Sequence, residues 1–242
     1  MEYGLQMYSV RDITGKDLKG ALKQVADIGY KYVEFAGFFG HEANEVKGWL
    51  EEFGLTASGT HTGINPLLDD FEGTVKYHKA IGCPAIIIPG ADLSCQEKLD
   101  AFVKNANMLI PRLADEGITL GYHNHGHEFR ANRDGSMIHE QLVYRTDLRF
   151  EIDTFWYYDQ TGISAKGILE RLKDRIDFIH IKDGFRSGEG MPLGCGNAPV
   201  REAYDTAKKL NMLMVVESES LKPDGISEAR ECFRYLRKQE NN

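Results

Sequence analysis

The sequence lacks the features that mark several common classes of protein. Its 4 cysteines, among 242 residues, are scattered and form no CxxC pair, which argues against a disulfide framework and a cysteine zinc site. No apolar stretch approaches the ~20 residues that a membrane-spanning helix needs. No early segment combines a charged start, an apolar run and a small-residue cleavage site, as a signal peptide does. We therefore expect a soluble cytoplasmic protein with reduced thiols.

Basic residues are too few to favour a polyanionic partner. The chain has 29 Lys and Arg residues against 37 Asp and Glu residues, and its formal net charge is -8. Such a balance repels nucleic-acid phosphates and anionic lipid surfaces. We therefore expect no nucleic-acid partner and no membrane partner. Hydrophobic residues make up 42% of the chain, which is enough for a large core.

The sequence does contain a repeat of short apolar runs and amphipathic helical patterns. Runs rich in β-forming residues cover 4–9, 32–37, 56–61, 85–90, 118–125, 149–155, 177–183 and 212–219. Helical patterns between them include 17–29, 45–54, 95–117 and 198–210. The first of these has one apolar face, formed at three- to four-residue spacing by Leu18, Leu22, Val25 and Ile28.

This alternation predicts the fold. Strands that each lead into a helix must pair in parallel and be covered by those helices. Eight such units are the number that closes a (β/α)8 barrel. An open doubly wound sheet is the alternative, but no GxGxxG motif or P-loop follows the first strand. We predict an α/β fold, a single-domain (β/α)8 TIM barrel over residues 1–242, with glycines ending helices at Gly29, Gly54 and Gly117.

Polar residues cluster where the predicted strands end. Active sites of such barrels lie at the carboxyl ends of the strands, so these residues are the candidates for function. They are Glu34, His61, His123, Asn124, His125, Glu128, Asp153, His180, Lys182, Asp183, Glu217 and Glu219. Carboxylates mixed with imidazoles suit Mn²⁺, Mg²⁺, Co²⁺, Fe²⁺ or Zn²⁺, and the absence of thiolates argues against a structural zinc site.

Several of these residues also have a structural interpretation. An unpaired carboxylate inside an apolar run is costly, so Glu34 needs a partner, and a salt bridge to Lys182 or Arg11 is one alternative. The imidazoles of strand 118–125 are also compatible with ordinary hydrogen bonding inside the barrel. Asp183 is interpreted as the cap of the following turn. Glu219 is expected to point outward, because it alternates with Glu217 along the strand.

The motifs themselves resemble a known family. The pieces "LQMYSVRD", "YVEFAGF", "GTHTG", "GYHNHGHEF", "EIDTFW", "FIHIKDG" and "VVESES" follow one another over essentially the whole chain. In this order they are similar to the sugar phosphate isomerase/epimerase proteins, which have the xylose isomerase-like TIM barrel. The combination of the first piece with "YHNHxxEF" and "HIKD" is specific to a subgroup.

The resemblance implies one divalent metal ion, held by Glu, Asp, His and Glu from strands 5 to 8. Asp153, His180 and Glu217 fall on the last three ligand positions. Glu128 is the first choice for the remaining position, with His125 or His123 as substitutes. The resemblance also implies proton abstraction next to a metal-bound carbonyl through an enediolate, with Glu217 and Glu128 as the acid/base pair. Manganese is a typical ion for this chemistry.

The same resemblance suggests how a carbohydrate substrate is held. His61, Lys182 and Arg186 are expected to bind substrate oxygens, and Trp156 is expected to provide an apolar wall. Glu34, His123 and His125 are further candidates for substrate binding. The glycine-rich segment 184–199 is expected to be a mobile lid, with an ordinary flexible loop as the alternative.

Other functions remain open at this stage. Relatives on this barrel include lyases and dehydratases that act on inososes, 3-dehydroshikimate or 3-keto-glycosides, and these also start with proton abstraction. An endonuclease IV-like enzyme needs more metal ligands and a basic groove, which the net charge disfavours. A noncatalytic sugar-binding barrel is a third class. A homodimer is expected from the family resemblance alone.

Overall fold

Each of the apolar runs predicted to be strands forms one. In the computed structural model, which describes residues 1–132 and 135–240, these strands are parallel neighbours in one closed barrel, in the order β1-β10-β7-β6-β5-β4-β3-β2. Their bounds are β1 Gly4–Gln6, β2 Tyr32–Phe35, β3 Thr56–His61, β4 Ala85–Ile88, β5 Thr119–His123, β6 Arg149–Asp153, β7 Phe178–Ile181 and β10 Leu213–Val216. The predicted (β/α)8 barrel is therefore confirmed. The predicted domain of 1–242 also takes in 133–134 and 241–242, which lie outside the described residues.

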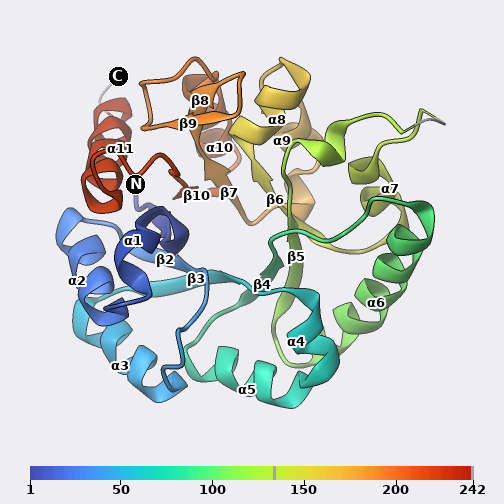
Figure 1. Ribbon diagram of the computed structural model, residues 1–242, viewed down its shortest axis with the longest axis horizontal. Coiled ribbons are helices and arrows are strands. Elements are labelled where there is room, and N and C mark those ends of the chain that lie inside the picture. The colour runs from blue at the N-terminus through green and yellow to red at the C-terminus, as the bar shows by residue number, and fades with distance from the viewer. Residues whose placement is uncertain (133–134, 241–242) are drawn as a thin grey trace.

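Helices surround the barrel, as Figure 1 shows. Those that follow the strands are α2 Leu18–Ile28, α3 Ala43–Phe53, α4 Ile64–Asp69, α5 Phe71–Ala80, α6 Gln96–Asp115, α7 Ile138–Arg145, α8 Thr154–Thr161, α9 Lys166–Arg171, α10 Val200–Lys209 and α11 Gly225–Gln239. Shorter pieces are η1 Met7–Val10, α1 Arg11–Thr14, η2 His127–Phe129 and η3 Lys173–Arg175. The glycines predicted to end helices, Gly29, Gly54 and Gly117, have positive φ angles, as glycines at helix C-termini often do.

Side chains alternate between the two faces of each barrel strand. In β7, Ile179 and Ile181 belong to the large apolar core formed with the helices. Phe178 belongs instead to a separate apolar cluster with Ala85, Ile87 and Val215, on the inward face. His180 shares that inward face and lies two residues closer than Phe178 to the carboxyl end of the strand. The amino-terminal end of the barrel interior is thus apolar, and polar groups follow above it.

The segment after β7 contains an antiparallel hairpin of β8 Asp183–Phe185 and β9 Glu189–Met191. The Asp183 carboxylate accepts hydrogen bonds from the backbone N–H groups of Gly184 at 2.8 Å, Gly194 at 2.9 Å, Gly196 at 3.0 Å and Ala198 at 3.1 Å. The interpretation of Asp183 as a turn cap is therefore confirmed. Whether the hairpin moves as a lid stays a prediction.

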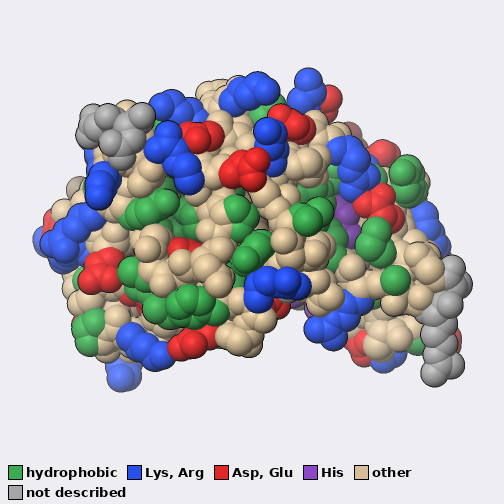
Figure 2. Space-filling view, turned by 90° about the horizontal axis from the view of Figure 1, so that it is seen from above, with side chains coloured by type: hydrophobic (Ala, Val, Ile, Leu, Met, Phe, Trp, Pro, Cys, Tyr) green, Lys and Arg blue, Asp and Glu red, His purple; other side chains and the backbone are tan. Residues whose placement is uncertain are grey.

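Acidic and basic side chains are interspersed over the face seen in Figure 2. Among the described residues, no helix has the length and apolar character needed to cross a membrane.

Candidate metal centre and active site

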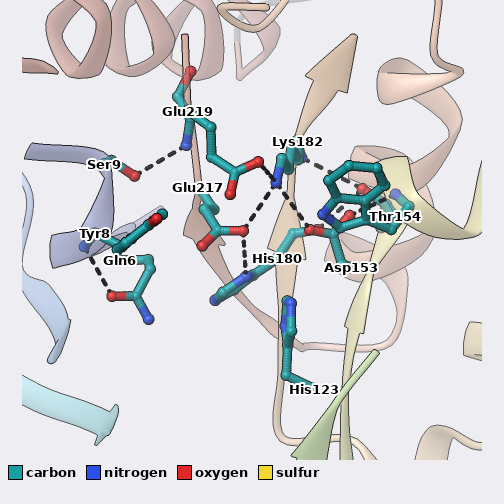
Figure 3. Close-up of polar contacts among 12 residues, drawn as sticks. Gln6, Tyr8, Ser9, His123, Asp153, Thr154, His180, Lys182, Glu217 and Glu219 are labelled. Atoms are coloured by element: carbon teal, nitrogen blue, oxygen red, sulfur yellow. Dashed lines mark hydrogen bonds and ion pairs between the residues drawn. The ribbon is translucent and has the colours of Figure 1, made fainter. Parts of the chain in front are cut away.

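The strand register brings the predicted polar residues together at the carboxyl end of the barrel. His123 at the end of β5 pairs with Glu151 of β6, and Asp153 at the end of β6 pairs with His180 of β7. Glu217 directly follows β10, the neighbour of β7 on the other side. Figure 3 shows Asp153, His180 and Glu217 directed toward one another from these strands. The convergence expected from the sequence is present.

Four of these side chains form a group that can hold a metal ion. One ligand atom each from His123, Asp153, His180 and Glu217 lies within 4.8 Å of every other, and all four residues are buried. The group supplies two imidazoles and two carboxylates, a donor set that suits divalent ions such as Mn²⁺ or Zn²⁺.

Two atoms of this group have no hydrogen-bond partner. Asp153 Oδ1 accepts a hydrogen bond from the Trp156 backbone N–H at 2.8 Å and thereby caps α8, whereas Asp153 Oδ2 has no hydrogen bond and only an ion pair with Lys182 Nζ at 3.6 Å. His180 Nδ1 is also without a hydrogen bond and lies 3.4 Å from Glu217 Oε2. Buried polar atoms without partners are costly, and a bound cation would satisfy both. The residues therefore fit a divalent metal.

The predicted substrate-binding residue Lys182 lies beside this group. Its ammonium nitrogen is 3.1 Å from Glu217 Oε2, 3.6 Å from Asp153 Oδ2 and in contact with the Glu219 carboxylate (Figure 3). The expectation that Glu219 points outward is therefore wrong. β10 ends at Val216, so the alternation of a strand no longer applies at residue 219. The Trp156 ring lies 4.9 Å from the Lys182 nitrogen and covers it on one side.

A second polar layer lies directly below, formed by His61, Glu34 and Glu151. Glu151 Oε2 lies 2.8 Å from His61 Nε2 and 3.1 Å from His123 Nδ1. Glu34 Oε2 accepts from Gln6 Nε2 at 2.8 Å and lies 2.6 Å from His180 Nε2. The salt bridge from Glu34 to Lys182 or Arg11 that the sequence suggested is not formed, since its partners are an amide and imidazoles.

The electrostatics of the site differ from residue to residue. Burial opposes ionisation of Glu217, but Lys182 and His180 outweigh it and hold the pKa of Glu217 well below its usual value. At Asp153 burial dominates over the attraction of Lys182 and raises the pKa to about 7. Burial lowers the pKa of His123 to about 3, despite its contact with Glu151. His123 is therefore a neutral imidazole near neutral pH, the form that ligates metals.

Glu128, the first choice for the fourth metal ligand, does not join this group. It lies in η2, fully buried, where its carboxylate accepts from the Tyr122 hydroxyl at 2.9 Å and from the His125 backbone N–H at 2.9 Å. These bonds fix the loop after β5, and His123, one of the two substitutes, joins the group in place of Glu128.

A pocket of about 340 Å³ opens above the site, a volume suited to a small molecule. Its lining comprises Tyr8, Ala36, His61, Pro89, His123, His125, Glu217 and Glu219. The sequence interpretation missed Tyr8, Ala36 and Pro89. Ala36 and Pro89 directly follow β2 and β4, and Tyr8 lies in η1, which follows β1. Arg186, expected to bind substrate, is not in this lining; its Nε donates to the Asp159 backbone carbonyl at 3.4 Å.

Comparisons with known proteins agree with this architecture. Residues 22–239 match the family model described as xylose isomerase-like TIM barrel. A sugar phosphate isomerase/epimerase from Parabacteroides distasonis superposes with a TM-score of 0.84 at 23% identity, over 98% of both chains. The probable 3-DHS dehydratase from Bacillus anthracis gives a TM-score of 0.78 at 12% identity, over 98% of this chain and 99% of the other.

A D-allulose 3-epimerase from Methylomonas sp. gives a TM-score of 0.71 at 16% identity, over 99% of this chain and 98% of the other. No curated protein sequence gave a significant match. At these identities the superpositions establish the fold, whereas the family model covers most of the chain. The chain therefore belongs to the xylose isomerase-like TIM barrel family.

Proposed function

We propose that the protein is a divalent-metal-dependent isomerase or epimerase of a sugar, keto-sugar or polyol. The observation that carries this proposal is the convergence of one ligand atom each from His123, Asp153, His180 and Glu217 within 4.8 Å, with Asp153 Oδ2 and His180 Nδ1 buried and without a hydrogen bond. The structural similarity to an enzyme described as D-allulose 3-epimerase supports the class of reaction.

The ion would be held by His123, Asp153, His180 and Glu217. When bound, it would act as a Lewis acid that polarises a carbonyl group and makes the neighbouring C–H bond more acidic. The donor set is compatible with Mn²⁺, Mg²⁺, Co²⁺, Fe²⁺ or Zn²⁺, and Mn²⁺ is the ion that we propose to test first.

Glu217 is the residue best suited to take the proton. Its carboxylate is ionised, because its pKa is held low by Lys182 and His180 despite burial, and it lines the pocket. The return of the proton requires a second group at the pocket. Glu128 does not line the pocket, so we assign this step to His125, which lines the pocket together with Glu217 and would return a proton that it takes up from solvent.

The remaining lining groups would orient the substrate. His61 is placed to donate a hydrogen bond to a hydroxyl or carbonyl oxygen, and Tyr8 with Pro89 would provide an apolar wall. Lys182, expected from the sequence to bind substrate, is buried against Glu217 and does not line the pocket. Trp156 supports Lys182 rather than the pocket itself. This mixture of polar and apolar lining suits a small carbohydrate.

A lyase or dehydratase is the second candidate function. The similarity to a probable 3-DHS dehydratase favours it, and elimination begins with the same removal of a proton next to a carbonyl. An endonuclease IV-like activity and a noncatalytic sugar-binding role have no such support. The cytoplasmic location, the homodimer and the absence of a nucleic-acid partner stay predictions.

Deuterium exchange tests the proposal without knowledge of the product. The protein is incubated in D₂O with Mn²⁺ and a panel of ketohexoses and inososes, and proton NMR follows the loss of the signal next to the carbonyl. We expect exchange with at least one compound and a loss of at least 100-fold in Glu217→Gln. The matched control is Glu52→Gln, whose side chain is exposed.

Exchange that is equally fast in Glu217→Gln would contradict the proposed role of this residue. Exchange without release of water supports the isomerase or epimerase, whereas formation of an unsaturated product supports the lyase.

A further inference from the structure

A pair of buried carboxylates lies beneath the proposed metal site and belongs to no step of the proposed reaction. Glu34 is fully buried on β2, and Glu151 is 1% exposed on β6. Neither lines the pocket, so neither reaches a substrate there. Ionisable groups buried in this way destabilise a fold unless ion pairs and hydrogen bonds offset the cost of removing them from water.

The contacts of these carboxylates are concentrated on imidazole nitrogens. His180 Nε2 lies 2.6 Å from Glu34 Oε2 and 3.0 Å from Glu151 Oε1. The other nitrogen of the same ring, Nδ1, has no hydrogen bond and belongs to the side that faces Glu217. In its neutral form, a ring that donates Nε2–H to the carboxylates below keeps the lone pair of Nδ1 directed toward the cation site above.

His123 follows the same rule with its nitrogens exchanged. Its Nδ1 lies 3.1 Å from Glu151 Oε2, which leaves Nε2 for a ligand. His61 Nε2 contacts the same carboxylate oxygen at 2.8 Å. One carboxylate on β6 thus contacts imidazoles from β3, β5 and β7.

The hydrogen bonds of Gln6 extend this arrangement to β1. Gln6 Nε2 donates to Glu34 Oε2 at 2.8 Å, and Gln6 Oε1 accepts from the Tyr8 backbone N–H at 3.0 Å. The amide therefore fixes both the carboxylate below the site and the backbone of a residue that lines the pocket.

We infer that Glu34 and Glu151 are positioning residues for the metal centre. They fix the ring orientation and the tautomer of both histidines, so that His180 Nδ1 and His123 Nε2 face the cation. The inference rests on the proposed function, because it requires a metal ion at His123, Asp153, His180 and Glu217.

A competing arrangement uses the lower layer as the metal site itself. His61, His123, Glu151 and His180 also bring ligand atoms within 4.8 Å of one another, and Glu34 Oε1 and Glu151 Oε1 have no hydrogen bond. The two groups share His123 and His180. The two possible metal sites therefore differ in which nitrogen of each ring would bind the ion. We favour the upper group, because the imidazoles already have carboxylate partners in the lower one.

The ligating nitrogen distinguishes the two arrangements. The full-length protein is labelled with ¹⁵N-histidine, freed of metal and titrated with Zn²⁺, and long-range ¹H–¹⁵N spectra identify the bound nitrogen of each ring. We expect ligation of His180 at Nδ1 with retention of Nε2–H. The signals of His78, whose ring contacts Thr60 and Thr74 away from the site, serve as an internal control.

Calorimetric titration with Zn²⁺ provides the second measurement. We expect one ion per chain in the wild type and an affinity at least tenfold lower in Glu151→Gln and in Glu34→Gln. Glu151→Asp keeps the charge but shortens the side chain, so we expect it to remain weaker than the wild type.

The outcomes separate the two proposals. A wild type that binds no metal would remove the metal site, and with it the proposed function. Binding through His180 Nε2, or wild-type affinity in Glu151→Asp, would overturn the positioning role while leaving a metal-dependent enzyme possible.

Discussion

The ammonium nitrogen of Lys182 lies 3.1 Å from Glu217 Oε2, beside the atoms that we propose to hold a metal ion. The side chain of Lys182 is fully buried, and its ammonium nitrogen also lies 3.6 Å from Asp153 Oδ2. The two carboxylates that contact Lys182 are therefore also two of the groups that we propose as metal ligands. In the absence of the ion, Lys182 supplies, with His180, the positive charge that keeps Glu217 ionised inside the barrel despite its burial.

The first prediction concerns Lys182→Met. Because it leaves buried carboxylates without their cation, we expect the metal-free variant to lose about 3 kcal/mol in the free energy of unfolding. The same change removes a charge that repels the ion, so the affinity for Mn²⁺ should rise about tenfold. Thermal unfolding with and without Mn²⁺ checks both effects. A variant whose Mn²⁺ affinity falls would show that Lys182 supports the metal instead of competing with it.

The second prediction concerns the loop fastened by Asp183. Its carboxylate satisfies four backbone N–H groups between residues 184 and 198, so Asp183→Ala leaves them without partners. We expect faster amide hydrogen exchange throughout 184–198 and a stability loss of about 3 kcal/mol. Exchange in the α3 helix, on the far side of the barrel, should be unchanged. Protection of 184–198 equal to that of the wild type would contradict the role of Asp183.

The barrel and the convergence of polar residues at its carboxyl end were predictable from the sequence. Asp153 and His180 each end an apolar run, and parallel pairing of neighbouring strands necessarily brings such positions together. Those two assignments depend on strand period and topology, which the sequence encodes locally. The proposed roles of the residues are not tested by the fold itself.

The positions that the sequence could not predict lie beyond the strand ends. Glu128 is directed by hydrogen bonds from Tyr122 and from the backbone of His125, and no periodicity reports these. Glu219 lies in a loop where strand alternation has stopped. The contact between Glu34 and His180 joins residues 146 positions apart across the barrel, and it depends on a register that only the closed sheet defines.

The third prediction concerns Gly59 of β3, which pairs with Glu34 of the neighbouring strand β2. A Cβ atom at Gly59 of β3 would lie 2.8 Å from Phe178 Cζ and 3.4 Å from Glu34 Oε1. Phe178 is 5% exposed and closed in by the apolar cluster, so its ring has little room to move. We expect Gly59→Ala to lose about 2 kcal/mol in the free energy of unfolding, measured by urea titration. Gly48→Ala in α3 is the control, because a Cβ there would meet nothing within 4 Å apart from its chain neighbours and the backbone of its own helix.

The last prediction concerns the pH dependence of stability. Burial lowers the pKa of His123 to about 3, whereas an unfolded histidine titrates near 6.5. Between these values the unfolded chain binds a proton at this residue and the folded chain does not, so acid favours unfolding. The contribution of His123 is fully present above pH 6.5 and is lost as the pH falls toward 3.

We therefore compare the metal-free wild type with His123→Gln between pH 6 and pH 4. The free energy of unfolding of the wild type should fall more steeply, by about 1.4 kcal/mol per pH unit relative to the variant. Equal slopes would mean that His123 protonates in the folded protein as readily as in the unfolded chain. In that case a neutral imidazole would not be ready for the metal at mildly acid pH, and the assignment of His123 as a ligand would lose its electrostatic basis.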